Sequence, residues 1–514
     1  MADPRTARRV SVSRSDAESW AAHAPGVDVR AELVRDGSLP GRWRRRWSER
    51  PAWPQLRDVD GTWITSEELE ARTRAYAGSL LQAGLAPGDR WLLCGSTSAA
   101  LVIAYIGALR AGLIVAPVNP AYTEPEVARI VADARPAGAA IESMEIAGWV
   151  RAATGREIQV HGLEARVGID ERVDGARGED PALLLYTSGT TGRPKGALLT
   201  HGNLLASATA VGLAWRWETG DRLLLALPLF HAHGLGVGLH GTLCAGAAVA
   251  LRERFDPADV AERCASGEYS MFFGVPTMYT RLEEPRRLGE LAGLRLLVSG
   301  SAPLPAALAE RIAAHAGQIP LERYGMTETI MLTSNLYDGP RKPGTVGIPL
   351  PGVELRLADD GEVQVRGPNV IAGYWERPEA NAESFTDDGW FRTGDLGELD
   401  EDGSLTLVGR SKELIISGGF NVYPREVEEA IGTHPAVREV TVVGLRSERW
   451  GEEVTAFVVS GGPVPERELL DHAAQRLTAY KVPKRVEFVE SLPRNALGKI
   501  VRAELARRAS GGRE

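Results

Sequence analysis

The 514-residue sequence has few cysteines and no long apolar run. Its cysteines, Cys94, Cys244 and Cys264, are too scattered for a metal site, and their odd number argues against a disulfide framework. We expect buried, reduced thiols. No apolar run approaches the roughly 18 residues that a membrane span needs, and the N-terminal stretch MADPRTARRV lacks the apolar core of a signal peptide. These absences favour a cytoplasmic protein without a membrane span.

The sequence also lacks the net positive charge that is typical of nucleic-acid-binding proteins. Its 59 Lys and Arg and 68 Asp and Glu give a formal net charge of -9, so we expect no nucleic-acid partner. The run RWRRRW, residues 42–47, is a local exception. Contact with RNA or a membrane surface is one interpretation of this run. Packing of its two tryptophans on the body of the protein is the interpretation we favour.

The pattern along the chain predicts an α/β protein. From about residue 51, short apolar runs alternate with helical patterns, which is typical of βαβ units with a parallel sheet. Residues 63–85 predict a helix that has Thr65 as N-cap, Glu68 at the capping-box spacing and Gly84 at its end. Strands are expected at residues 90–95, 223–227, 271–273 and 294–298.

The pattern changes after about residue 343, where alternating apolar and polar residues with turn dipeptides predict a β-meander. A compact segment of strands and helices follows residue 410 and is long enough for a small α+β domain. We therefore expect an N-terminal arm or cap (1–50), a large domain of parallel and mixed sheets with helices and a β-subdomain (51–410), and a small α+β domain (411–514).

YTSGTTGRPKG, residues 186–196, predicts a phosphate-binding loop behind a buried strand. It departs from the G-x-x-x-x-G-K-[ST] spacing of the common phosphate loop. Its inner glycines let backbone N–H groups converge on an anion, and its hydroxyls and lysine add polar contacts. The residues concerned are Thr187, Ser188, Gly189, Thr190, Thr191, Gly192 and Lys195. A surface loop without function is the alternative.

The stretch YTSGTTGRPKGA resembles the phosphate-loop signature of the adenylate-forming superfamily, which includes acyl-CoA synthetases, luciferases and the adenylation domains of peptide synthetases. Four more motifs follow in that family's order: YGMTET, GWFRTGDLG, GRSKELIISGGFNVYPREVE and PRNALGKI. The resemblance covers nearly the whole chain from about residue 51. It implies that a carboxylate attacks the α-phosphorus of ATP, with Mg²⁺ bound, and that coenzyme A then takes the acyl group.

The resemblance implies roles for single residues. Thr327 and Glu328 would contact a phosphate and Mg²⁺, and Lys499 would bridge the carboxylate and the α-phosphate. The small domain (411–514) would be a mobile lid with Lys412 as its hinge, and Gly418 and Gly419 would face the thiol tunnel. The remaining nucleotide contacts would be Ser301, Ala302, Pro303, Arg323, Tyr324, Gly325 and Met326, with Asp395 and Arg410 on the ribose. The alternatives are a surface acid for Glu328, a plain turn for SGSAP and a solvated lysine for Lys499.

Two stretches bear on the acid substrate. LPLFHAHGL places His231 and His233 at the family's acyl-pocket gate, and GVPTMYTRL carries Arg281. A buried arginine needs an anion, and a second carboxylate on the substrate would supply one.

Together with SGSA and ERYGMTET, these stretches resemble the malonyl-CoA and methylmalonyl-CoA synthetases. This resemblance implies that Arg281 and Ser301 bind the distal carboxylate and that Ala232 and Met326 border the α-carbon. Alternatively, Arg281 is exposed and pairs with Glu283 or Glu284. The remaining functional alternatives are a short- or medium-chain or aromatic acyl-CoA ligase, an adenylation enzyme that loads a carrier protein, and a non-catalytic nucleotide sensor.

Overall fold

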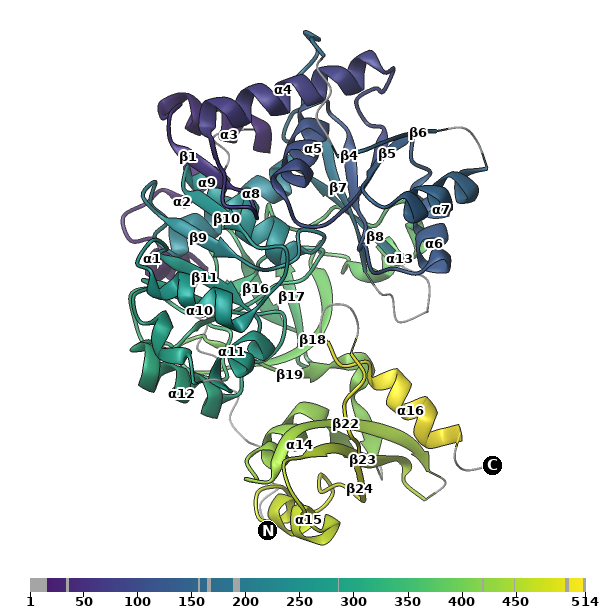
Figure 1. Ribbon diagram of the computed structural model, residues 1–514. Coiled ribbons are helices and arrows are strands. Elements are labelled where there is room, and N and C mark those ends of the chain that lie inside the picture. Colours follow the sequence, from purple (N-terminus) through teal and green to yellow (C-terminus); the bar gives the residue numbers. More distant parts are fainter. Residues whose placement is uncertain are drawn as a thin grey trace. The chain divides into compact units, whose positions relative to one another are not determined.

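The computed structural model describes residues 16–33, 37–155, 158–163, 168–187, 195–284, 286–417, 420–447, 449–494 and 499–511 (Figure 1). The chain divides into two compact units. Unit 1 comprises Met1–Leu355, Val365–Phe391 and Glu401–Ser404, and unit 2 comprises Arg356–Gln364, Arg392–Asp400 and Leu405–Glu514. Among the described residues, no helix is both long and apolar enough to cross a membrane.

The larger sheet of unit 1 brings the ends of several strands to one edge. Its order, within the described residues, is β15-β14-β13-β12-β11-β9-β10-β1-β2. Strands β9 to β13 pair in parallel with one another, so the segments that follow β9, β11, β12 and β13 gather where α/β proteins bind ligands. The strands are β1 (Pro54–Arg57), β2 (Trp63–Thr65), β9 (Arg222–Leu225), β10 (Ala248–Leu251), β11 (Met271–Gly274), β12 (Leu296–Ser299), β13 (Leu321–Tyr324), β14 (Thr333–Ser334) and β15 (Ile348–Pro349).

A second sheet of unit 1 has the order β6-β5-β3-β4-β7-β8. Its strands are parallel except for β8, which pairs antiparallel with β7. Both sheets alternate with helices along the chain, and this confirms the predicted α/β class. The strands of this sheet are β3 (Arg90–Cys94), β4 (Ile114–Pro117), β5 (Gly138–Ile141), β6 (Gln159–His161), β7 (Pro181–Thr187) and β8 (Lys195–Thr200).

The helices of unit 1 follow the local sequence signals. The predicted capping box of Thr65 and Glu68 is present at the start of α4, which ends two residues before Gly84. The described helices are α1 (Asp16–His23), α2 (Val29–Leu33), α3 (Leu39–Glu49), α4 (Ser66–Gln82), α5 (Ala99–Arg110), α6 (Glu124–Ala134), α7 (Met144–Thr154), α8 (His201–Ala214), the π-helix η1 (His233–Leu239), α9 (His240–Ala245), α10 (Pro257–Ala265), α11 (Pro276–Glu283), the 3₁₀-helix η2 (Leu288–Leu291), α12 (Ala306–Ala316) and α13 (Pro378–Ser384).

The first 50 residues contain the helices α1 to α3, which the sequence pattern did not predict. Ser38 caps α3, and Trp43 and Trp47 on that helix are buried. The basic run therefore packs its tryptophans on unit 1, as favoured from the sequence. Farther upstream, the indole N–H of Trp20 donates to the carbonyl of Val353 at 2.9 Å. All three cysteines are buried free thiols, as predicted.

Unit 2 contains most of a four-stranded sheet and all of a five-stranded sheet. The first has the order β16-β17-β18-β19, which is the predicted meander. In the second, β22 and β23 form a long antiparallel pair, and β24 adds to β23 in parallel. The elements are β16 (Glu354–Leu357), β17 (Glu362–Arg366), β18 (Phe391–Leu399), β19 (Leu405–Arg410), η3 (Ser411–Glu413), β20 (Ile415–Ser417), β21 (Phe420–Val422), α14 (Pro424–Gly432), β22 (Val437–Ser447), β23 (Gly451–Ser460), α15 (Glu466–Ala474), β24 (Arg485–Phe488) and α16 (Arg502–Gly511).

Candidate active site

The predicted phosphate loop joins β7 to β8. Thr187, the last residue of β7, pairs in register with Lys195, the first residue of β8. Residues 188–194 lie outside the described residues, and with them Ser188, Gly189, Thr190, Thr191 and Gly192. The Lys195 ammonium lies 5.4 Å from the centre of the Tyr374 ring. The backbone N–H of Trp375 donates to the carbonyl of Gly196 at 2.8 Å, so a segment far along the sequence lies against the base of the loop.

The YGMTE motif forms a tight turn after β13. Tyr324 ends that strand and is buried. A side chain at Gly325 would overlap the backbone carbonyl of Ile330, and Ile330 has a φ of +59°. The Asn369 amide donates to the carbonyls of Thr329 and Met331 at 3.0 and 2.7 Å. The lack of a side chain at Gly325 therefore permits the turn, and the two hydrogen bonds from the Asn369 amide hold it in place.

Glu328 lies at the centre of this turn and is only 6% exposed. The Tyr374 hydroxyl donates to its Oε1 at 2.9 Å. Burial and the adjacent Glu328 carboxylate raise the Tyr374 pKa well above its usual value, so the phenol keeps its proton and stays a donor. Tyr374 thus contacts both a buried carboxylate and Lys195, two residues from separate predicted motifs.

The described residues contain no cluster of three or more His, Cys, Asp or Glu side chains that could hold a metal ion. Glu328 is a buried carboxylate that belongs to no such cluster. That donor set fits Mg²⁺, which needs only one or two carboxylates when phosphates and waters complete its octahedral shell. It does not fit a metal held by protein ligands alone.

The SGSAP loop follows β12 and contacts the histidine stretch. Ser301 has a φ of +68°, and its hydroxyl lies 3.2 Å from Nδ1 of His233. Burial, with smaller contributions from Arg323 and His231, lowers the His233 pKa well below its usual value. His233 is therefore neutral at physiological pH. Its Nε2 is buried and has no hydrogen-bond partner among the described residues.

Arg323 lies directly behind this loop. A side chain at Gly300 would overlap its guanidinium, so glycine permits the close approach. Arg323 is buried, and its Nε and Nη2 have no hydrogen-bond partner within the described part of the chain. Burial lowers the Arg323 pKa to about 9, which still leaves it charged near neutral pH. Arg323 is therefore a buried cation beside His233 and Ser301, and the described residues provide no counter-ion for it.

Three further predicted acyl-pocket residues lie in the histidine stretch and in the YGMTE turn. His231 and Ala232 precede the π-helix η1, and Met326 lies in the YGMTE turn; all three are half-buried. Ala302 and Pro303 are exposed in the SGSAP loop.

Arg281 is exposed on α11, and its guanidinium lies 5.1 Å from the centre of the Phe255 ring. Among the described residues no ion pair joins it to Glu283 or Glu284, and Glu283 pairs with Arg311 instead. The inward orientation needed for the distal-carboxylate role is therefore not present. The exposure predicted by the alternative is present, but its ion pair is not found among the described residues.

Unit 2 carries the other predicted residues. Asp395 and Arg410 face each other on β18 and β19, and Arg410 Nε donates to Asp395 Oδ1 at 2.9 Å. Lys412 is exposed in η3, and Lys499 is exposed next to the bridge between Arg494 and Ile500. Gly418 and Gly419 lie outside the described residues.

Sequence reasoning missed Tyr374, and it placed His233 at the acyl-pocket gate without predicting its contact with Ser301. Tyr374 lies in AGYW, which has no motif spacing of its own. Only the fold shows that this tyrosine contacts Glu328 and Lys195. The sequence did draw attention to His233, because only one residue separates it from a second histidine, His231.

Comparison with known proteins shows which families, proteins and structures the chain is similar to. A family model described as AMP-binding enzyme matches residues 43–375, and one described as AMP-binding enzyme C-terminal domain matches residues 426–499. A feruloyl-CoA synthase of Amycolatopsis sp is 40% identical over 466 residues, which is 87% of this chain and 94% of that protein. A malonate–CoA ligase of Arabidopsis thaliana is 38% identical over 367 residues, 64% of this chain and 60% of that protein. The crystal structure of ATP-bound MatB from Rhodopseudomonas palustris matches with a TM-score of 0.85 and 37% identity, covering 92% of this chain and 99% of that one.

Proposed function

The chain belongs to the AMP-binding enzyme family and is an ATP-dependent acyl-CoA ligase, and from this premise we propose that its acid is a short dicarboxylate, malonate or methylmalonate. The reaction joins two anions, so the site has to neutralise charge and align the reactants. Unit 1 supplies Lys195, Glu328 and Tyr374 for the phosphates and Mg²⁺. Bound Mg²⁺ would offset charge on the leaving pyrophosphate.

Buried Arg323 is the observation that carries the dicarboxylate assignment. Its guanidinium has unused donors, and no anionic side chain of the described residues lies close to it. Burying a charge in this way is costly unless a partner binds. A substrate carboxylate would accept charge-assisted hydrogen bonds from it. Ser301, held by neutral His233, is an adjacent hydroxyl donor for the same carboxylate.

A nucleotide phosphate is the competing partner for Arg323, as the YGMTE motif first indicated. The neighbours of Arg323 favour the acid, because it lies against the SGSAP loop and the histidine stretch. Arg281 is exposed in this structure and could contribute only after its side chain leaves Phe255.

In unit 2 we assign Lys499 to adenylation, the pair Asp395 and Arg410 to the ribose, and Lys412 to the hinge. The motif resemblance supports these roles. Exposure of Lys412 and Lys499 is compatible with residues that act during domain movement, since a hinge needs backbone freedom and a mobile lysine needs access.

An aromatic and basic surface on unit 2 fits the nucleotide part of coenzyme A. The rings of Phe420 and Tyr480 stack with centroids 4.7 Å apart, and Phe420 is 55% exposed. The Lys481 ammonium lies 5.8 Å from the Tyr480 ring, and that of Lys484 lies 5.4 Å from the Trp450 ring. Exposed aromatic faces suit an adenine, and the lysines suit its phosphates.

Pyrophosphate release measured over malonate, methylmalonate, succinate, acetate, octanoate, benzoate and ferulate tests the substrate. We expect malonate or methylmalonate to have the highest kcat/KM. A malonate value no better than acetate would overturn the proposal. A preference for ferulate would support the aromatic alternative, which the similarity to a feruloyl-CoA synthase favours.

The variants Arg281→Ala and Arg323→Met, assayed with malonate and acetate, separate the two arginines. Loss of malonate activity in Arg323→Met alone would assign the distal carboxylate to the buried residue.

A further inference from the structure

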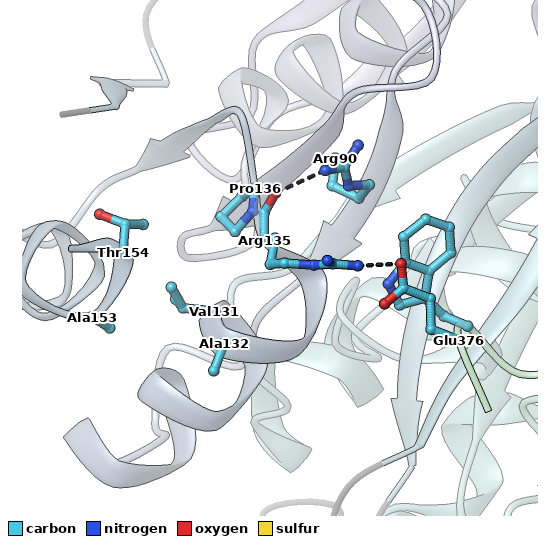
Figure 2. Close-up of a pocket in the computed structure, with 9 residues that line it drawn as sticks. Arg90, Val131, Ala132, Arg135, Pro136, Ala153, Thr154 and Glu376 are labelled. Carbon is cyan, nitrogen blue, oxygen red and sulfur yellow. Dashed lines mark hydrogen bonds and ion pairs between the residues drawn. The ribbon is translucent and has the colours of Figure 1, made fainter. Parts of the chain in front are cut away.

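A hollow of about 630 Å³ lies in unit 1 outside the residues assigned above (Figure 2). It is bordered by the C-terminal ends of α6 and α7, the start of β3, and residues 375 and 376. The volume is within the range of small-molecule sites. Its lining residues are Arg90, Val131, Ala132, Arg135, Pro136, Ala153, Thr154, Trp375 and Glu376.

Two of the three charged residues that line the hollow, Arg135 and Glu376, pair with each other. Arg135 and Glu376 form an ion pair across the hollow, as Figure 2 shows, and their side chains are 55% and 51% exposed. Both have left-handed backbones, with φ values of +46° and +48°. An exposed ion pair contributes little to stability, whereas left-handed backbone at a non-glycine residue is unfavourable. At Arg135 this conformation is the C-cap that ends α6, as in many helices, whereas Glu376 follows no helix. The exposed pair is therefore poorly explained as a stabilising contact, and the strained backbone of Glu376 points to function.

The charges of the hollow match a ligand that carries both signs. Arg90 donates to the carbonyls of Ala134 and Arg135, each at 3.0 Å, and so offsets the negative end of α6. Arg135 offers a guanidinium, and Glu376 offers a carboxylate. A plain anion would meet Glu376 and the negative C-terminal end of α7, and a plain cation would meet two arginines. A zwitterion satisfies both.

The rest of the lining is apolar. Val131, Ala132, Pro136 and Ala153 provide aliphatic surface, and the Trp375 ring forms an aromatic wall with the Arg90 guanidinium 5.7 Å from its centre. An apolar side chain would bury surface against these groups and gain the usual hydrophobic free energy. The volume of the hollow, its charges of both signs and its apolar lining together fit a small zwitterion with an apolar side chain.

The segment that carries Glu376 also contacts the candidate active site. Tyr374 donates to Glu328, and Trp375 N–H donates to the carbonyl of Gly196 at the base of the phosphate loop. On the other side, Arg377 pairs with Asp133, which also accepts from the Tyr186 hydroxyl at 2.9 Å. A ligand that separates Glu376 from Arg135 therefore acts on a segment joined to both motifs.

We propose that this hollow is an effector site for an α-amino acid with an apolar side chain. The carboxylate pairs with Arg135, the ammonium pairs with Glu376, and the side chain packs on Trp375 and the aliphatic residues. Coupling through residues 374–377 makes its affinity depend on bound ATP, and by linkage ATP affinity depends equally on the amino acid.

Isothermal titration of the full-length protein with L-leucine tests the site. N-acetyl-L-leucine lacks the ammonium, isopentylamine lacks the carboxylate and glycine lacks the side chain, and we expect each to bind at least tenfold more weakly. Glu376→Gln and Arg135→Gln should each weaken leucine binding by a similar factor. The matched control is Glu283→Gln, which removes a carboxylate from another ion pair of unit 1 and should leave binding unchanged.

The coupling is tested by repeating the titration with saturating ATP, where we expect the Kd of leucine to change at least threefold. Absence of leucine binding would overturn the site, as would equal binding of N-acetyl-L-leucine or of the Glu376→Gln variant. If ATP leaves the Kd of leucine unchanged, the coupling is overturned, and the hollow is a binding site without an effect on ATP affinity.

Discussion

Replacing Arg323 with methionine should make the protein more stable and less active at the same time. Burial lowers the Arg323 pKa to about 9, a fall that corresponds to roughly 4–5 kcal/mol of unfavourable free energy for the charged form. Methionine has a similar length and no charge. Part of that cost should be recovered, because replacing buried ionic groups with apolar ones stabilises proteins by about 1–4 kcal/mol.

The activity of Arg323→Met should fall selectively. Truncating one partner of a buried charge pair costs about 2–5 kcal/mol, so kcat/KM for malonate should drop by roughly 30- to 5,000-fold. Acetate has no distal carboxylate, and its kcat/KM should change little. The assays are thermal unfolding, which should show a Tm raised by a few degrees, and pyrophosphate release with each acid at several ATP concentrations.

Arg110→Met is the matched control. Arg110 is also fully buried, but it pairs with Glu70 and Asp174 at 2.9 and 2.8 Å, so its loss should destabilise the protein by about 3–5 kcal/mol. If Arg323→Met destabilises the protein as Arg110→Met does, the folded chain holds a counter-ion for Arg323 and the reasoning fails. Equal losses for malonate and acetate with a raised KM for ATP would instead assign Arg323 to the nucleotide.

Four further outcomes are expected. Tyr374→Phe removes the hydrogen bond to Glu328 and should lower kcat/KM about tenfold or more, since hydrogen bonds to charged groups contribute about 1.5–3 kcal/mol; unchanged pyrophosphate release would contradict the role of Tyr374. Lys499→Ala should abolish adenylation but leave thioester formation from supplied acyl-adenylate, and equal loss of both would contradict the assignment. Gly325→Ala places a Cβ against the carbonyl of Ile330, so the YGMTE turn should be distorted and activity lost; near-normal kcat would show that the turn adapts. Burial raises the Glu70 pKa, but hydrogen bonding and the charge of Arg110 outweigh it and hold that pKa below its usual value. The pair therefore stabilises the protein above the unfolded-state pKa of Glu70, and this contribution is lost as pH falls through the folded-state pKa; a destabilisation by Arg110→Met that stays constant down to about pH 3 would contradict this.

Local signals in the sequence predicted the elements that build the large sheets. The capping box at Thr65 and Glu68 and the apolar runs near residues 92, 224, 272 and 297 correspond to observed helices and strands. The N-terminal helices were missed although Ser38 and Pro40 form a start signal for α3. Their burial depends on contacts with distant residues such as Val353, which sequence periodicity does not reveal.

The motifs predicted which residue types the site uses, but not how they contact one another. The hydrogen bond from Tyr374 to Glu328 joins residues 46 positions apart. Arg323 stands out only because the fold buries it with no hydrogen-bond partner for its Nε and Nη2 in the part of the chain that the structure describes. Arg281 shows the opposite limit. Its motif context suggested a buried cation, whereas the fold leaves it exposed on α11, because position on a short helix depends on what the helix packs against.

The contact of Trp20 with Val353 has a consequence for synthesis on the ribosome. The two residues are separated by 333 positions, and β1 likewise pairs with β10 about two hundred residues later. At about 5–20 residues per second, α1 emerges tens of seconds before its docking surface exists. The nascent chain therefore exposes apolar helix faces for most of its translation, and slowing elongation should increase capture by chaperones of the N-terminal segment more than of unit 2.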